Sequence, residues 1–332
     1  MNDSRPFRLV IPGSSANLGP AFDSAALAVR LHLRVLAEPA SEFAISASGR
    51  DSHKCSDVDR SLILQTYKEV LAAEEHRPQP LSLKIHNEVP IGKGCGSSAT
   101  ARLAGVALAN HFGELKWNNQ RVLEEAAKRE GHADNVAACW LGGFVIVQSP
   151  QANVSNAAGD GGRDLRAFKI PIPRRWPLLL VVPATPVPTH EARRVLPVAY
   201  SREQAVANIQ SSMLLALALA EGRGDLLSKA LHDCLHEPYR AALFPWLTSL
   251  RRLSMQPEVL GVVLSGAGPS VLFILHEDAS VFRIKKLISS CLAESCHDAE
   301  LIETEVEACG GADSLAGHLQ QNRKPVREAT SL

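Results

Sequence analysis

The chain has 332 residues, a length that favours two packed domains with a cleft between them over a single core. Its 35 Lys and Arg residues balance its 35 Asp and Glu residues, so no global field draws it to nucleic acid or a membrane, and we expect a small-molecule partner. No apolar run approaches membrane-spanning length, and the seven cysteines include no CxxC pair, so we expect a cytoplasmic protein with reduced thiols.

The first half of the chain mixes predicted strands and helices. Apolar residues that alternate or gather between Pro and Gly indicate strands, whereas apolar residues spaced three and four apart indicate helices. The expected strands are 7–11, 31–37, 82–86 and 144–148, and the expected helices are 59–73, 100–111, 119–129 and 134–141.

The second half is also expected to combine helices and strands. Residues 149–164 have little apolar content, which indicates a mobile hairpin or an interdomain connection. We therefore divide the chain into domains at 1–160 and 161–320, followed by a polar tail at 321–332. The expected strands here are 178–182, 259–264 and 270–275, and the expected helices are 202–221, 225–234 and 280–293. The fold class is α+β.

A glycine-rich segment, VPIGKGCGSSATA at 89–101, is the most informative part of the sequence. Three alternate glycines let the backbone approach a ligand, and a helix that begins at Ser97 or Ser98 would add unpaired amides and a positive dipole end. The spacing matches neither a P-loop nor a dinucleotide-binding turn. A phosphate site and an ordinary Gly/Ser turn before a helix explain the glycines about equally well.

A second polar cluster, EGHADNV at 130–136, places two carboxylates, an imidazole and an amide in six residues. Taken alone, it is most simply a helix cap at Asp134 beside a solvated Glu130. Next to a phosphate loop, Glu130 and the hydroxyl of Ser97 or Ser98 would instead suit Mg²⁺, which takes few carboxylates and keeps several waters.

Four further segments carry polar residues suited to a ligand. The segment 11–23 follows a strand as a loop of small polar residues and offers Asn17 and Asp23. THEARR and HEPYR each supply an arginine, Arg193 or Arg240, which can grip a carboxylate in a bidentate manner. The glycine turn at 264–270 is either a simple hairpin or a backbone wall near a ligand. For each arginine alone, a surface salt bridge is the plainer explanation.

Taken together and in this order, these segments resemble the GHMP kinases, and within that superfamily the homoserine kinases. The resemblance rests on PGSSANLGPAFD, PIGKGCGSSATA, EGHADNVAA, THEARRVLP and HEPYR, and spans about residues 8 to 310. Ser14 and Ser15 stand where the mevalonate and galactose branches usually carry Lys or Arg. Ala21 and Cys95 depart from the family, which prefers Gly and Leu there.

The resemblance implies a two-domain fold with a ribosomal protein S5-like N-terminal domain, containing a left-handed βαβ unit, and a ferredoxin-like C-terminal domain. It implies ATP- and Mg²⁺-dependent phosphorylation of the L-homoserine hydroxyl in threonine biosynthesis, by a protein that is expected to form a homodimer. Another small-alcohol kinase of this superfamily, for mevalonate or a sugar, is the alternative, and a metabolite-binding regulator without catalysis is a third.

The resemblance also implies roles for individual residues. Those expected around the ATP phosphates are Pro90, Ile91, Gly92, Lys93, Gly94, Cys95, Gly96, Ser97, Ser98, Ala99 and Thr100. Those expected around homoserine are Asn17, Asp23, His132, Asp134, Asn135, Thr189, Arg193, Arg240, Gly266 and Gly268. Ser98 and Glu130 are expected to hold Mg²⁺, and Lys93 to supply positive charge. Asp23 is expected to bind the substrate first and to accept its proton second, and residues around 61–64 to shelter the adenine.

Overall fold

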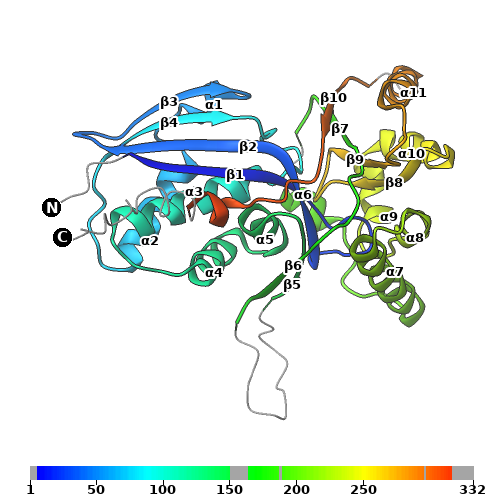
Figure 1. The fold of residues 1–332 in the computed structure, drawn as a ribbon, viewed down its shortest axis with the longest axis horizontal. Coiled ribbons are helices and arrows are strands. Elements are labelled where there is room, and N and C mark those ends of the chain that lie inside the picture. The colour runs from blue at the N-terminus through cyan, green and yellow to red at the C-terminus, as the bar shows by residue number, and fades with distance from the viewer. Residues whose placement is uncertain (1–5, 150–163, 187–188, 295–296, 316–332) are drawn as a thin grey trace, which may run out of the picture.

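The N-terminal part of the protein is a sheet covered by helices, seen in the computed structural model of the chain (Figure 1). The structure describes residues 6–149, 164–186, 189–294 and 297–315. The strands of this sheet are β1 (Phe7–Ala16), β2 (Ala25–Pro39), β3 (Ala44–Gly49), β4 (Leu81–Asn87), β5 (Phe144–Gln148) and β6 (Arg166–Ile170). The helices are α1 (Ser52–Cys55), α2 (Leu62–Ala73), α3 (Ser97–Phe112), α4 (Asn119–Glu130) and α5 (Asp134–Leu141).

The long strand β2 organises this sheet. Residues 33–39 of β2 pair with β4, and residues 25–27 pair with β5. Strand β1 runs antiparallel to β2 along most of its length. The parallel pair β3–β4, joined through α1 and α2, forms the βαβ unit. Helix α2 is an example of how the helices pack against this sheet. Its first turn is capped by Ser61, whose side chain accepts from the Leu64 N–H, and its apolar residues Ile63, Tyr67 and Val70 face the core.

The C-terminal sheet has the order β10-β7-β9-β8 with every pair antiparallel. Its strands are β7 (Leu178–Pro183), β8 (Val259–Leu264), β9 (Val271–Leu275) and β10 (Ala299–Thr304), and its crossover helices are α7 (Arg202–Glu221) and α11 (Val281–Glu294). This βαββαβ order is the ferredoxin-like arrangement, so the expected fold is confirmed. Shorter helices lie between these elements: α6 (Thr189–Arg194), α8 (Gly224–Ala230), α9 (Glu237–Arg240) and α10 (Pro245–Arg251).

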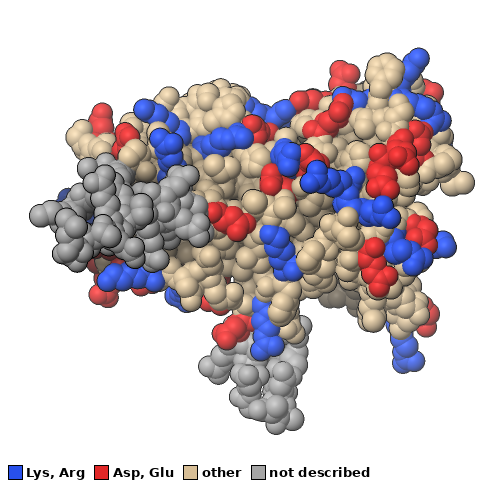
Figure 2. Space-filling model, in the orientation of Figure 1, with Lys and Arg blue, Asp and Glu red and all other residues tan. Residues whose placement is uncertain are grey.

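The two sheets share one buried hydrophobic cluster, besides a core in each part. Leu27, Val29 and Phe144 of the first sheet pack in the same buried cluster as Trp176 and Leu215 of the second part. Both signs of charge intermingle over both parts on the face shown in Figure 2, as the balanced composition predicts. No helix within the described residues is both long and apolar enough to cross a membrane.

The chain returns to the first sheet after β10. Val306 bridges Val29, the Glu307 N–H donates to the Ala28 carbonyl over 3.0 Å, and Ala312 belongs to the core under α3 and α5. The expected division at 160/161 and the tail at 321–332 lie outside the described residues, as does nearly all of the expected hairpin at 149–164. On either side of that gap, β5 and β6 pair with each other in the first sheet.

Most expected elements are present, with altered ends. The loop expected after residue 11 is wrong, because β1 continues to Ala16 through a bulge between Pro12 and Gly13. The helix expected at 225–234 ends at Ala230, since the Asp233 carboxylate instead accepts from three backbone N–H groups beyond it. The elements missed are α1, α6, α9, α10, β3, β6 and β10.

Candidate active site

A cavity of about 720 Å³ is lined by residues of both domains. It collects most of the residues that the sequence singled out, among them Asn17, Asp23, Ile91, Gly92, Gly94, Gly96, Ser97, Ser98, Thr100, Glu130, His132, Asp134, Asn135, Arg193, Arg240, Gly266 and Gly268. Of residues 61–64, expected to shelter the adenine, 61–63 also line it, whereas Leu64 is buried in the core of the first domain. One cavity therefore joins the glycine loop, the acidic cluster and both arginines.

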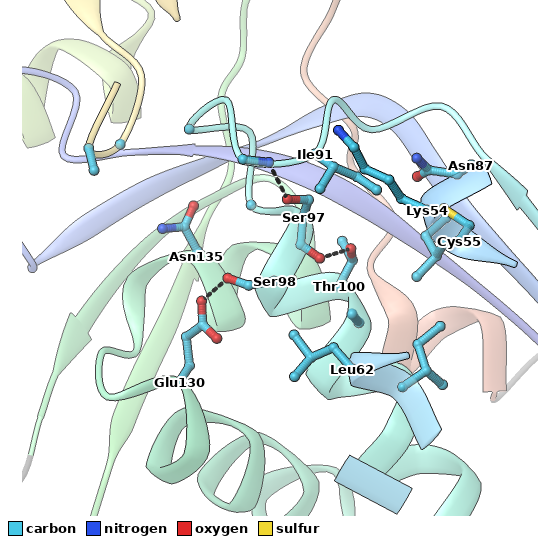
Figure 3. Close-up of a pocket in the computed structure, with 18 of the residues that line it drawn as sticks. Lys54, Cys55, Leu62, Asn87, Ile91, Ser97, Ser98, Thr100, Glu130 and Asn135 are labelled. Atoms are coloured by element: carbon cyan, nitrogen blue, oxygen red, sulfur yellow. Dashed lines mark hydrogen bonds between the residues drawn. The ribbon is translucent and has the colours of Figure 1, made fainter. Parts of the chain in front are cut away.

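The glycine loop leads directly into α3. This helix begins at Ser97, with Gly96 at the N-cap in the left-handed conformation, so its first-turn amides are free to meet a ligand in the cavity (Figure 3). The Gly92 N–H donates to the Ser97 hydroxyl over 3.2 Å, which folds the loop back over the helix start. The N-terminus of α3 therefore lies at the part of the cavity where the sequence predicts a phosphate site.

The C-terminal domain closes the loop from the other side. Gly94 has a φ of 76°, and a Cβ there would lie 2.2 Å from the carbonyl oxygen of Ser265, so only glycine fits. The Ser265 hydroxyl donates to the Gly94 carbonyl over 2.7 Å, and the Gly266 N–H donates to the Ala16 carbonyl over 3.1 Å. The turn at 264–270 is thus a backbone wall of the site, where the sequence left a simple hairpin open.

Glu130 and Ser98 lie together at the mouth of this helix. The Ser98 hydroxyl donates to one carboxylate oxygen of Glu130 (Figure 3), and Arg102 Nε donates to the other over 2.9 Å. The Glu130 side chain is only 7% exposed, so the plain interpretation of a solvated residue is wrong. The alternative cap at Asp134 is also absent, because α5 begins at Asp134 itself with no side-chain cap.

These two residues have the donor chemistry for a hard cation. One carboxylate and one hydroxyl oxygen beside a phosphate loop match the sparse protein ligation that Mg²⁺ uses, with phosphate and water completing the shell. Among the described residues, no group of three or more His, Cys, Asp and Glu is arranged to hold a metal on its own. The residues therefore fit a cation that arrives with a triphosphate.

His132, Asp134 and Asn135 form a hydrogen-bonded group next to Glu130. His132 Nδ1 lies 2.9 Å from an Asp134 carboxylate oxygen, and the Ser14 hydroxyl donates to Asn135 Oδ1 over 2.7 Å. Burial opposes protonation of the imidazole, but the hydrogen bond and charge of Asp134, together with Glu130, raise the pKa of His132 above its ordinary value. The group fixes the orientation of Asn135 toward the cavity.

Asp23 and the two arginines meet at the other end of the cavity. Arg193, on α6, forms a bidentate ion pair with Asp23 at 2.9 and 2.7 Å. The guanidinium groups of Arg193 and Arg240 lie 5.5 and 5.4 Å from the centre of the Phe22 ring. Asn17 joins them, because its Oδ1 accepts from the Asp23 N–H and its Nδ2 donates to the Gly266 carbonyl. Opposite charges thus converge within one pocket.

Arg240 is held by buried neighbours that sequence reasoning did not single out. Its Nη1 lies 3.0 Å from His236 Nδ1, and the other ring nitrogen, Nε2, lies 2.8 Å from the Gly19 carbonyl. Burial lowers the pKa of His236 to about 4, so the ring is neutral and accepts from Arg240. Burial likewise raises the pKa of Glu237 to about 7. The signal that could have identified these two residues is their position beside Arg240 in the motif HEPYR.

Lys93 does not face the cavity. Its ammonium donates to the carbonyl oxygens of Pro183, over 2.7 Å, and Ala184, at the end of β7. Burial contributes most to lowering its pKa. The expectation that this lysine supplies charge to a triphosphate therefore disagrees with its position, because the side chain is already engaged in joining the loop to the C-terminal sheet.

The remaining expected residues have other positions. Cys95 is buried in the shared core, where burial raises its thiol pKa to about 12, and Ala99 is buried in the core of the first domain. Pro90 does not line the cavity, and Thr189 is the first residue of α6. Ala21 lacks a positive φ, so alanine replaces the family's glycine there without backbone strain.

Comparisons with known proteins show the family of this chain. The family model for the GHMP kinases N terminal domain matches residues 61–143, and that for the GHMP kinases C terminal matches residues 215–293. A homoserine kinase from Solibacter usitatus is 44% identical over 266 residues, covering 80% of this chain and 84% of that protein. A homoserine kinase from Synechocystis is 34% identical and covers 88% of this chain and 92% of that protein.

Solved structures show the same fold. The crystal structure of homoserine kinase from Cytophaga hutchinsonii superposes with a TM-score of 0.75 at 23% identity, covering 93% of this chain and 98% of that one. L. major mevalonate kinase in complex with R-mevalonate gives 0.67 at 16% identity, covering 92% and 99%. Fold and site together define a small-molecule kinase of the GHMP class. Within it, the chain belongs to the homoserine kinase family.

Proposed function

We propose that this protein transfers the γ-phosphoryl group of ATP to the side-chain hydroxyl of L-homoserine, as a step of threonine biosynthesis. The observation that carries the proposal is the single cavity with a glycine loop and helix N-terminus at one end and the Asp23, Arg193 and Arg240 group at the other. The first end suits a triphosphate, and the second suits an α-amino acid.

The nucleotide would lie along the first domain. The amides of the loop and of the first turn of α3 would hold the phosphates, and the wall formed by the turn at 264–270 would limit their movement. Residues 61–63, at the start of α2, would shelter the adenine. This division assigns the phosphates to backbone groups.

Ser98 and Glu130 would hold Mg²⁺, which when bound to the triphosphate neutralises charge on the transferred group. The Ser98–Glu130 contact already places both oxygens together, and Arg102 fixes the carboxylate from its far side. Ser98 and Glu130 thereby orient the terminal phosphate toward the acceptor end of the cavity.

Homoserine would be bound by its two charged ends. Arg193 and Arg240 would take the carboxylate, and Asp23 would take the ammonium group. This grip would leave the hydroxyl to face the phosphate, with Asn135 close to its path. Phosphoryl transfer passes through a loose transition state, so alignment contributes more than a strong base, and Asp23 acts first in binding.

The same geometry argues against mevalonate or a sugar as acceptor. A mevalonate carboxylate that draws Arg193 away from Asp23 would leave Asp23 without a cation, and galactose carries no charge with which to replace the Asp23–Arg193 pair. An unpaired charge in a partly buried pocket costs binding free energy, so these acceptors are disfavoured.

The test is ADP release by the purified protein with ATP and Mg²⁺, compared across L-homoserine, mevalonate, galactose and no acceptor. We expect turnover with L-homoserine alone, with O-phospho-L-homoserine as the product identified by mass spectrometry. Equal turnover with mevalonate, or ADP release that no acceptor increases, would contradict the proposal.

We also propose a cytoplasmic homodimer. No disulfide joins the cysteines within the described residues, as a reducing compartment favours. On α7, Val206, Ile209, Met213 and Leu217 form an exposed apolar stripe, 45–70% exposed. Arg202 and Glu221, at the two ends of α7, are equally distant in sequence from the middle of this stripe, so two antiparallel copies of the helix would pair their charged ends.

Size-exclusion chromatography with light scattering, which measures the molar mass in solution, tests this interface. We expect a dimer, and we expect Met213→Glu to yield monomers. The control, Phe282→Glu, adds the same charge at an exposed apolar residue of α11 and should leave the dimer intact. A monomeric wild-type protein, or loss of the dimer in the control as well, would contradict the assignment of α7.

A further inference from the structure

The nucleotide end of the cavity contains a cation that does not come from the glycine loop. Because the Lys93 ammonium is bound to the carbonyls of Pro183 and Ala184, the loop has no free cationic side chain of its own. Lys54, on α1, lines the same cavity with its side chain 51% exposed. Figure 3 shows the Lys54 side chain running alongside Ile91, the residue that opens the loop.

One carboxylate links Lys54 to the loop. Asp51 lies just before α1, and its Oδ1 is 3.2 Å from the Lys54 ammonium. Its Oδ2 accepts from the Ile91 N–H, also at 3.2 Å. One oxygen of the Asp51 carboxylate therefore contacts the start of the glycine loop, and the other contacts the Lys54 ammonium. This shared contact fixes the position of Lys54 relative to the loop.

We infer that Lys54 contacts the phosphate groups of the bound nucleotide and that Asp51 is its positioning residue. The inference rests on the proposed function only in that a nucleotide occupies the loop. An ammonium group has three donors, and the contact with Asp51 uses one, so Lys54 keeps donors for phosphate oxygens. Its flexible stem lets the ammonium follow the ligand while Asp51 keeps it near the loop.

Other cations of the cavity are placed differently. Arg193 and Arg240 lie at the acceptor end, around Phe22. Arg60 also lines the cavity, but its side chain is 90% exposed and its nearest acid is Asp57 at 3.9 Å. Arg60 thus offers a matched control, since its removal deletes one positive charge from the same cavity without touching the loop.

Calorimetric titration with ADP and with adenosine, in the absence of any acceptor, tests the inference. Lys54→Ala should weaken ADP binding by about tenfold, the usual effect of losing one charge-assisted hydrogen bond, and should leave adenosine binding within about twofold of wild type. Lys54→Arg should recover most of the ADP affinity. Arg60→Ala should change ADP binding by less than about twofold.

Three outcomes would overturn the inference: unchanged ADP affinity in Lys54→Ala, an equal loss for adenosine, or an equal loss in Arg60→Ala. The positioning role of Asp51 is tested by Asp51→Asn, which should weaken ADP binding less in the Lys54→Ala background than in wild type. Equal losses in the two backgrounds would refute that role. Failure of the proposed function would instead appear as wild-type protein that binds ADP but does not phosphorylate homoserine.

Discussion

Asp23 and Arg193 are partners of each other in the structure, although both are assigned to the substrate. Their bidentate pair, at 2.7 and 2.9 Å, keeps a carboxylate and a guanidinium satisfied inside the cavity. A zwitterion can replace this pair with two new ones, one at each charge, whereas a ligand with a single charge leaves one residue without a partner. The resting pair thus makes selectivity for amino acids a matter of charge balance.

Replacement of Asp23 by Asn separates binding from proton transfer. We expect Asp23→Asn to raise KM for L-homoserine by about 10- to 100-fold, because one charge-assisted contact to the ammonium is lost, while kcat changes by less than about fivefold. Steady-state kinetics with saturating ATP measure both constants. A fall in kcat of about a hundredfold or more, with KM unchanged, would instead identify Asp23 as the proton acceptor.

His236 gives the protein a predictable response to acid. Its pKa falls to about 4 in the folded state, mainly through burial, whereas an unfolded histidine titrates near its ordinary value of 6.5. The unfolded chain therefore binds more protons in this window, and this residue's share of stability is lost as the pH falls from about 6.5 toward 4.

Thermal unfolding at pH 7, 6, 5 and 4 checks this prediction. We expect the melting temperature of the wild type to fall more steeply than that of His236→Gln, whose amide can still contact Gly19 and Arg240 but does not titrate. Parallel curves for the two proteins would show that other groups govern the acid response.

The glycine loop illustrates how one element depends on another domain. The Lys93 carbonyl accepts from the Ser270 N–H, and Gly94 touches the Ser265 carbonyl, so the position of the loop is set jointly by α3 and by the turn at 264–270. The shape of the phosphate site is therefore a product of domain contact, and a change at the contact should reach the nucleotide.

Gly94→Ala tests that dependence against a control. At Gly131 the φ is 85°, yet a Cβ would meet nothing within 4 Å, so Gly131→Ala carries backbone strain alone, about 1–2 kcal/mol. Gly94→Ala adds a clash with a backbone oxygen and should cost roughly 3–5 kcal/mol of unfolding free energy and most of the ADP affinity. Chemical denaturation and calorimetry measure the two effects, and equal losses in stability would refute the clash.

The elements that the sequence revealed are those whose own residues determine them. The expected ranges 202–221 and 134–141 match α7 and α5, and the glycines after α5 mark its end. Strand β10 was missed because AELIET is half exposed and gains its conformation by pairing with β7. The missed contribution of Lys54 has the same origin, since 36 residues separate it from Ile91 and only the β3–β4 crossover brings them together.

At the scale of the whole molecule, the shared core should make the two domains unfold together. Trp176 and Leu180 of the C-terminal part pack in one cluster with Leu27 of β2, so this cluster stays buried only while both sheets are folded together. We expect a single calorimetric transition with a van't Hoff enthalpy close to the calorimetric one. Two resolved transitions would show that the sheets are stable independently.

The return of the chain after β10 has a consequence for how the protein is made. Ala312 belongs to the core of the first domain, and the Ser314 hydroxyl accepts from the Val10 N–H over 3.0 Å, so the domain translated first lacks part of its interior until residues 312–314 have been made. Nascent chains arrested on the ribosome near residue 180 should stay open to protease, whereas full-length ones should resist it. The first domain therefore stays incomplete and exposed during synthesis until residues 306–314 can pack against it.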